Sequence, residues 1–202
     1  MKGRLVTVLT VSLLTGCTMA GRNQATMPTR EGDMQRIETK RLVLRPFAAD
    51  DWKDFQELAV DWKTAPGPAF DKWRTSAEAC RESVQHMATK DNYFAMALRN
   101  SGKVVGLLAI NAVDEKKQAD LGHVILSKYQ DNDHDKEALR AMVQHCFDVR
   151  GAQSIITHNA SSHTVQITPL HSLGFTNTNR ETPGELTLNK ADWDRRRPVT
   201  SK

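Results

Sequence analysis

The stretch IETKRLVLRPF, residues 37–47, decides how the fold begins, together with the Ala-Ala-Asp-Asp that follows it at 48–51. Apolar residues alternate within it at Leu42, Leu44 and Pro46, which predicts a strand over 37–47. The apolar spacing then becomes that of a helix over 48–60, through Trp52, Phe55, Leu58 and Ala59. The acidic pair at 50–51 suits the positive end of that helix. A strand therefore leads directly into an amphipathic helix.

The same kinds of pattern continue to residue 189 and outline one domain that mixes helices and strands. Helical spacing predicts helices over 76–89, 135–149 and 165–173, and Pro169 is expected to kink or shorten the last. Apolar runs predict strands over 93–99, 104–113, 119–126, 153–157, 174–178 and 185–189. Asn100-Ser101-Gly102 joins the first two of these strands as a hairpin.

The composition is that of an ordinary globular domain. The chain has 202 residues, of which 39% are hydrophobic and 26% charged, and its net charge is +4. These values exclude collagen-like, coiled-coil and disordered proteins. Residues 1–34 carry +2 and residues 190–202 carry +3, so residues 35–189 carry −1. A nucleic-acid-binding protein concentrates positive charge on its folded domain, so we expect no nucleic acid partner.

Residues 1–16 have the order of a secretory signal peptide. Two positive charges at Lys2 and Arg4 precede an uncharged apolar run at 5–14. That run is too short for a membrane-spanning helix, which needs about 20 residues. Leu14-Thr15-Gly16-Cys17 resembles a bacterial lipobox, which implies cleavage before Cys17 and acylation of its thiol. Thr18 then implies the outer membrane.

The residues after the lipobox, 17–34, are small and polar and predict a flexible tether behind the lipidated Cys17. The chain is thus expected to be anchored to a membrane by its lipid, in the cell envelope and facing the periplasm. One alternative stays open, because MQRIETKRLVLRPF at Met34 reads as a complete cytosolic start. If translation begins there, the protein is cytoplasmic.

The order of the expected elements resembles that of the GNAT superfamily of N-acetyltransferases. Residues 37–47 with Asp50-Asp51 are similar to the opening of its ribosomal-protein-alanine acetyltransferase branch. The later similarities are Asp120-Leu121-Gly122 with Tyr129, Glu137-Ala138-Leu139, and Leu173-Gly174-Phe175. The resemblance covers about residues 35–178. It implies a GNAT domain over 35–189 in the α/β class, with a mixed, mostly antiparallel central sheet flanked by helices. It also implies acetyl transfer from acetyl-CoA to an amine.

The resemblance places the cofactor's pyrophosphate at the start of the central helix, in a loop of pattern Arg/Gln-x-x-Gly-x-Gly/Ala. Here residues 130–135 read QDNDHD, so Asp133 and Asp135 occupy the two small positions and Asp131 precedes them. Carboxylates repel phosphate, and their side chains hinder the close approach that glycine allows. A simpler interpretation is that these acids cap a helix and face water.

The residues at the family's second cofactor-contacting motif also differ from the family pattern. In that branch an Asn and a Ser, eleven and eight residues before the Gly of Gly-Phe, contact the cofactor. Counting back from Gly174 gives His163 and Gln166. Asn159 and Ser162 lie nearby and could substitute only if the loop is shifted by one residue. Because both cofactor-contacting motifs differ from the family pattern, we expect that the chain keeps the fold but does not bind the cofactor. No catalytic residue is assigned.

Two metal sites are conceivable, but the sequence favours neither. Asp131, Asp133 and Asp135 resemble the first ligands of a calcium loop, but Lys136 and Met142 stand where such a loop needs Gly and Glu. His134, His158 and His163 could collect a transition metal, although solvated surface histidines are the simpler interpretation. We therefore expect no metal.

The remaining cysteines and the C-terminal end have plain interpretations. Cys80 and Cys146 lie on apolar helix faces and predict buried free thiols, with a disulfide as the alternative in an oxidising compartment. Residues 190–202, which contain Arg195-Arg196-Arg197, predict a solvated basic tail.

Two functions are therefore expected as alternatives. The first is a GNAT-fold envelope lipoprotein without acetyltransferase activity or cofactor, acting as a binding or structural module for an unidentified protein or small molecule. The second is an active N-acetyltransferase that uses acetyl-CoA through a divergent loop and is translated from Met34.

Overall fold

The computed structural model describes residues 36–64, 73–178, 181–182 and 184–196, so the expected signal peptide, Cys17 and the tether lie outside the described residues. The strands are β1 (Ile37–Glu38), β2 (Leu42–Arg45), β3 (Tyr93–Leu98), β4 (Val104–Val113), β5 (Gln118–Ile125), β6 (Ser154–His158), β7 (Thr176–Asn177) and β8 (Glu185–Asn189). The helices are η1 (Ala49–Asp51), α1 (Trp52–Lys63), α2 (Ala77–Ala88), η2 (Ser127–Asn132), α3 (His134–Asp148), α4 (Thr164–Leu173) and α5 (Lys190–Arg196).

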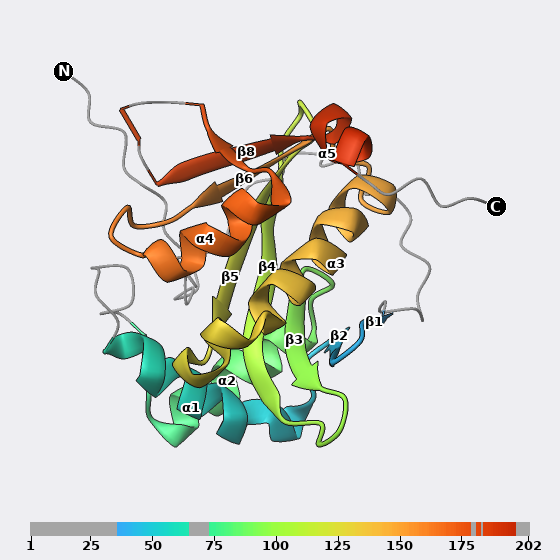
Figure 1. The fold of residues 1–202 in the computed structure, drawn as a ribbon. Helices are drawn as coiled ribbons and strands as arrows, with labels where there is room; N and C mark the ends of the chain where they lie inside the picture. The colour runs from blue at the N-terminus through green and yellow to red at the C-terminus, as the bar shows by residue number, and fades with distance from the viewer. Residues whose placement is uncertain (1–35, 65–72, 179–180, 183, 197–202) are drawn as a thin grey trace, which may run out of the picture.

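The strands form one eight-stranded sheet in the order β1-β2-β3-β4-β5-β6-β8-β7. Neighbouring strands are antiparallel except for β5 and β6, which are parallel. Helix α3 contacts β2, β5, β6 and α4, whereas α1 contacts α2 and β4 (Figure 1). The first seven residues of β4 are all buried, as expected of a central strand that is covered on both faces. The expected mixed α/β sheet flanked by helices is confirmed.

The opening strand expected over 37–47 is divided in two. Between β1 and β2, the Thr39 N–H donates to Leu42 O at 2.9 Å. The Arg41 N–H donates to Glu137 Oε1 of α3 at 2.6 Å, and the Arg41 guanidinium lies 2.7 Å from Oε2. Burial raises the pKa of Glu137, but hydrogen bonds from the Thr39 hydroxyl and from Arg41 outweigh it and lower that pKa. The sheet edge is thus held to the central helix by a carboxylate that the local pattern of residues 37–47 does not reveal.

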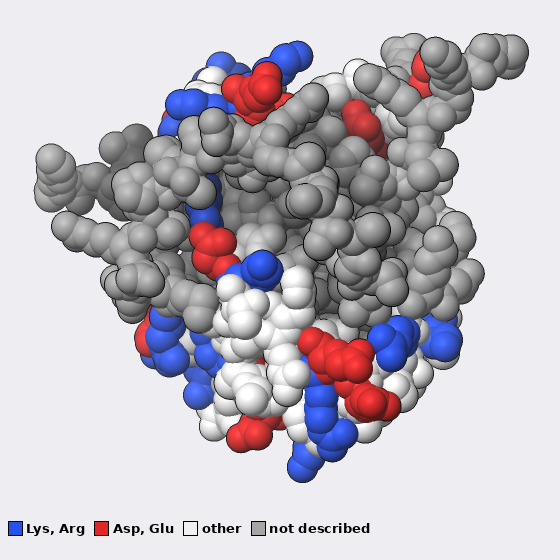
Figure 2. Space-filling model, turned by 180° about the vertical axis from the view of Figure 1, so that it is seen from behind, with Lys and Arg blue, Asp and Glu red and all other residues white. Residues whose placement is uncertain are grey.

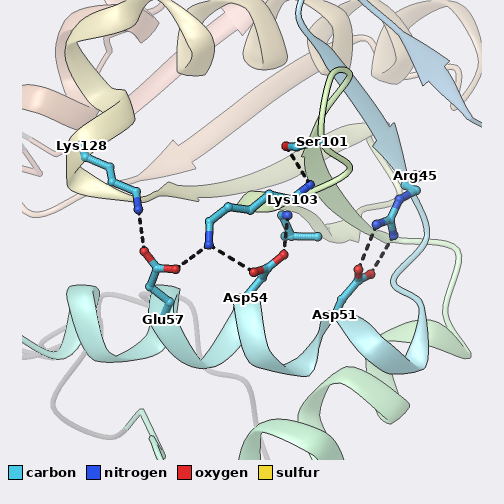
Figure 3. A network of polar contacts seen from close by, with 8 residues as sticks. Arg45, Asp51, Asp54, Glu57, Ser101, Lys103 and Lys128 are labelled. Atoms are coloured by element: carbon cyan, nitrogen blue, oxygen red, sulfur yellow. Dashed lines mark hydrogen bonds and ion pairs between the residues drawn. The ribbon is translucent and has the colours of Figure 1, made fainter.

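Ionic contacts fix α1 to the sheet (Figure 3). Asp51 accepts two hydrogen bonds from the Arg45 guanidinium, at 2.7 and 2.9 Å. Lys103 lies 3.2 Å from Asp54 and 2.6 Å from Glu57. Lys128 of η2 lies 2.7 Å from the other oxygen of Glu57. Hydrogen bonds from the two lysines lower the pKa of Glu57. η1 is therefore joined to β2, and α1 is joined to the residue before β4 and to η2.

The C-terminal segment expected to be a tail from residue 190 instead begins with helix α5. Trp193 of α5 is only 4% exposed, and its ring lies 6.4 Å from that of Phe147 in α3. Gly174 ends α4 with a φ of +102°, and a Cβ there would lie 2.8 Å from the Arg196 guanidinium. Burial of one tryptophan offsets the cost of ordering a short charged helix. The basic-tail expectation is therefore wrong for residues 190–196, and residues 197–202 lie outside the described part.

Other local expectations have clear outcomes. Helix α4 runs through Pro169 over ten residues, so the proline does not end it. Cys80 and Cys146 are buried free thiols, as the apolar helix faces predict. Burial raises the pKa of Cys146 to about 12.

Figure 2 shows the face opposite to that in Figure 1. On the described part of this face, positive and negative side chains are interspersed.

Within the described residues, no helix is both long and apolar enough to cross a membrane.

Candidate functional site

The two parallel strands at the middle of the sheet separate part-way along their length. β5 and β6 are paired only from Gln118↔Ser154 to Asp120↔Ile156. Beyond Asp120, β5 continues to Ile125 along β4, while β6 continues beside β8. The two strands point in different directions after this position (Figure 1). Residues 121–125 of β5 therefore have one edge that β6 does not cover.

The carbonyl groups of this edge can be identified from the register. The Leu126 N–H donates to Val105 O at 2.8 Å, and Val124 is opposite Leu107. Alternate residues of a strand direct their backbone groups to opposite neighbours. The carbonyls of His123 and Ile125 therefore point away from β4, toward the opening.

Side chains of this chain already donate hydrogen bonds to both of these carbonyl oxygens. Gln166 in the first turn of α4 donates from Nε2 to His123 O at 2.9 Å. The Trp62 indole N–H from the end of α1 donates to Ile125 O at 2.8 Å. Gln130 of η2 donates to the same Ile125 oxygen at 3.3 Å. Three different elements thus close the uncovered edge of β5.

His163 and Gln166, the two residues at the departing family positions, meet at this opening. His163 Nδ1 and Gln166 Oε1 are 3.0 Å apart, and both residues are 7% exposed. The His163 ring also lies 6.0 Å from that of Trp62. Asn159 instead bonds Thr157 Oγ1 at 3.1 Å, and its backbone N–H donates to Gly184 O. Ser162 is exposed. The structure therefore places His163 and Gln166 at the opening and directs Asn159 toward Gly184.

The loop before α3 keeps a backbone shape that suits glycine, although it has none. Asp133 has a φ of +56° and a ψ of +8°, in the left-handed region. Its side chain makes no capping hydrogen bond, so the expectation that this acid caps the helix is wrong. Of the other two acids, the Asp131 side chain is outside the described part, and Asp135 is buried at 4% exposure.

Asp135 faces a buried histidine of the sheet. Its Oδ2 atom lies 3.4 Å from Nε2 of His123, whose side chain is 1% exposed. This contact is close enough for an ion pair but is not aligned as a hydrogen bond, because Nε2 has no hydrogen-bond partner among the described residues. The same holds for the second carboxylate oxygen, Oδ1. Asp135 is thus buried beside His123, and one of its carboxylate oxygens has no hydrogen-bond partner among the described residues.

A cavity of about 310 Å³ lies between the start of α3 and α4. Its walls include Asp133 from the loop before α3, Asp135 and Lys136 from α3, and Thr164, Thr168 and Ser172 from α4. It adjoins the closed edge of β5, because Gln130 also lines it. The cavity therefore lies where the resemblance places a pyrophosphate, but with carboxylates in its wall.

The histidines considered for a metal have separate surroundings. His134 packs against Tyr129 with the rings 5.5 Å apart, and burial lowers its pKa. His158 lies 3.8 Å from Glu185, and His163 is bonded to Gln166. Among the described residues, no group of three or more His, Cys, Asp or Glu could hold a metal ion. The histidines thus do not gather into one site.

A second polar group, which the sequence analysis missed, lies where β5 and β6 are still paired. Burial raises the pKa of Asp120, and the nearby His158 acts in the opposite direction. Asn111 donates to Asp120 at 3.4 Å. The signal in the sequence was a carboxylate inside an apolar run, a residue type that is rarely buried without a partner. A carboxyl group with a raised pKa holds its proton more readily than an ordinary aspartate does.

Comparison with known proteins agrees with the observed fold. Residues 41–176 match the acetyltransferase (GNAT) domain family. No curated protein matches the chain in sequence. Among solved structures, the chain is similar to an acetyltransferase of the GNAT family from Bacillus anthracis, with 18% identity, a TM-score of 0.66, and coverage of 77% of this chain and 98% of that one. It is also similar to the ribosomal-protein-S5-alanine acetyltransferase from Vibrio fischeri, with 14% identity, a TM-score of 0.62, and coverage of 79% and 98%. These likenesses concern the fold.

Proposed function

Because this chain belongs to the acetyltransferase (GNAT) domain family, we propose that it is a GNAT-fold module that has lost acetyl-CoA binding and serves in the cell envelope as a binding module. The observation that carries the proposal is the closed edge of β5. Gln166 and Trp62 occupy the His123 and Ile125 carbonyls at 2.9 and 2.8 Å. A ligand that lies along this edge would have to displace both side chains.

The acidic start of α3 supports the same proposal. A helix N-terminus attracts phosphate through its free N–H groups and its dipole. Asp133 and Asp135 both line the adjoining cavity. At an effective dielectric constant of about 20, a carboxylate about 5 Å from a phosphate costs about 3 kcal/mol. Two such repulsions would remove most of the roughly 8 kcal/mol behind a micromolar affinity. The loop therefore disfavours the anion that its position in the fold would bind.

The envelope location rests on residues 1–17. A positively charged start, an apolar run and Leu14-Thr15-Gly16-Cys17 follow one another in the order of a lipoprotein signal. Several acyl chains on Cys17 would form a stable anchor, since each buried CH₂ contributes about 0.8 kcal/mol. Acetyl-CoA is a cytosolic metabolite, so a domain held beyond the inner membrane has little access to it. The expected envelope location and the closed edge of β5 thus support the same proposal, a module that does not bind acetyl-CoA.

One observation favours a second candidate, an active N-acetyltransferase translated from Met34. Asp120 is opposite Ile156 of β6, two residues from His158, and burial raises its pKa, so its carboxylate could accept the proton that an amine loses on acetylation. In that case Gln166 and Trp62 would have to withdraw from the edge of β5 when acetyl-CoA binds.

Intact mass measurement of the native protein, together with cell fractionation, separates the two candidates. The proposal expects a mature chain that begins at an acylated Cys17, in the membrane fraction, without transfer of labelled acetyl groups to amine substrates. A soluble, unmodified chain beginning at Met34 that acetylates an amine in the presence of acetyl-CoA would contradict it.

A further inference from the structure

We propose that helix α4 carries a self-association surface, through which the chain pairs symmetrically with a second copy of itself. This surface is independent of the proposed function, since pairing does not require that the chain bind or fail to bind acetyl-CoA. It consists of the exposed residues of 161–178, on α4 and around the edge strand β7, and is called the uncharged surface below. Its members are Ser161, Ser162, Thr164, Val165, Thr168, His171, Ser172, Thr176, Asn177 and Thr178.

The first observation is that this part of the chain has no acidic or basic side chain. Residues 151–178 contain no Asp, Glu, Lys or Arg, although 26% of the whole chain is charged and 26% of 28 residues is about seven. Burial does not explain this, because the residues of the uncharged surface are exposed. Depletion of charged residues is the compositional mark of the centre of protein–protein interfaces. The outer side of α4 therefore has the composition of a contact surface.

The second observation is that the polar groups of this surface can be covered at little cost. Thr168 Oγ1 donates to Thr164 O at 2.8 Å, and Ser172 Oγ donates to Pro169 O at 2.7 Å. A hydroxyl whose one hydrogen is already bonded leaves no unsatisfied donor when a partner covers it. Val165, which is 46% exposed, adds an apolar side chain. Valine and threonine have a stiff χ1 angle, so they lose less rotamer freedom on contact than long charged side chains do.

The third observation is a difference between the two edges of the sheet. Its edge strands, β1 and β7, are each two residues long. At β1, the Glu38 carboxylate lies 3.2 Å from the guanidinium groups of both Arg36 and Arg99. Charges of this kind protect an edge from pairing with another chain. At β7, residues 176–178 are uncharged. Of the two edges, the one that follows α4 therefore lacks this protection among its described residues.

The lack of charge favours a second copy over other partners. In a symmetric pair the same residues of both copies meet at the two-fold axis, so a charged residue there would face its own like charge. An uncharged surface avoids this repulsion. Nucleic acids, anionic lipid surfaces and charged peptides are bound through complementary charge, which this surface does not offer. Thr168 lies in the middle of the exposed side of α4, so we place the axis beside it, with the two α4 helices antiparallel.

Sedimentation velocity of the full-length protein over a range of concentrations tests this arrangement. A dimer should form reversibly as the concentration rises. Thr168→Glu and Thr168→Lys should each weaken the dimer at least about tenfold, because like charges then meet at the axis. An equimolar mixture of the two variants should restore it, because opposite charges then face each other. Val165→Glu should also weaken the dimer. Val60→Glu is the matched control, at a valine of α1 that is 49% exposed, and should leave the dimer unchanged.

Three results would overturn the inference: a monomer at every concentration up to about 1 mM, equal effects of Val165→Glu and Val60→Glu, or no recovery in the mixture of the two Thr168 variants. A monomer that binds phosphatidylglycerol vesicles, and loses this binding in Thr168→Glu, would assign the surface to a membrane and would also overturn it. Binding of acetyl-CoA is measured separately on the same protein. A monomer therefore refutes only the self-association surface, whereas acetyl-CoA binding refutes the proposed function.

Discussion

Gln166→Leu should destabilise the protein by about 2–4 kcal/mol. The Gln166 side chain is 7% exposed and makes two hydrogen bonds, from Nε2 to His123 O at 2.9 Å and between Oε1 and His163 Nδ1 at 3.0 Å. Leucine has a similar volume, so the change leaves no large cavity. It removes one partner from each of two buried groups, and a buried group left unsatisfied costs about 1–3 kcal/mol. The added apolar burial offsets only part of this loss.

Urea denaturation followed by circular dichroism measures the free energy of unfolding, and a thermal scan should show a loss of roughly 4–16 °C for a domain of this size. Ser172→Ala is the matched control on the same helix. Its exposed hydroxyl also donates to a backbone carbonyl, at 2.7 Å, yet its loss should change stability by no more than about 0.5 kcal/mol. If Gln166→Leu lowers the free energy of unfolding no more than this control does, the edge of β5 is not held closed by Gln166 and the reasoning fails.

Four further predictions concern single positions. Asp133→Gly should be more stable than Asp133→Ala by about 1 kcal/mol in urea denaturation, because φ is +56° at this residue. Inside a helix the order of the two variants would be reversed. A more stable alanine variant would contradict the left-handed backbone. Burial lowers the pKa of His145 to about 4, so the unfolded chain binds a proton that the folded chain rejects. Stability should therefore fall by about 3 kcal/mol as pH drops from about 6.5 toward 4, and His145→Gln should flatten that profile. The Cys146 thiol, whose pKa burial raises to about 12, should react with iodoacetamide at pH 8 only after unfolding, and rapid labelling of the folded protein would show that it is accessible. Cys17→Ala should leave an unprocessed or soluble precursor, and fractionation with membranes as in the wild type would exclude the lipid anchor.

The layout of the fold could be predicted from the sequence because its signals are local. The apolar runs in 93–99 and 104–113 and the helical spacing in 76–89 each depend on residues close to one another, and the structure places β3, β4 and α2 there. The helix start at Ser76 was equally visible, and its hydroxyl accepts from Ala79 N at 3.2 Å. The exceptions have non-local causes. Glu137 of α3 divides the first strand, and burial of Trp193 against α3 orders the segment expected to be a tail.

The candidate site was predicted only in part, for the same reason. His163, Gln166, Asp133 and Asp135 were found because each stands at a position that a family motif defines. The sequence could not show that Gln166 bonds a carbonyl 43 residues away. It could not show that the Trp62 indole reaches Ile125 O, 63 residues away. Nor does any local pattern pair Asp135 with a histidine inside the sheet. These contacts depend on how α1, α3 and α4 pack, which no single segment specifies.

The central claim is that the edge of β5 and the start of α3 no longer accept acetyl-CoA. Equilibrium dialysis of the full-length protein against labelled acetyl-CoA, at concentrations up to 1 mM, tests it most directly. The account predicts no saturable binding, because two side chains occupy the edge and two carboxylates line the adjoining cavity. Saturable binding of about one acetyl-CoA per chain, displaced by free CoA, would contradict it.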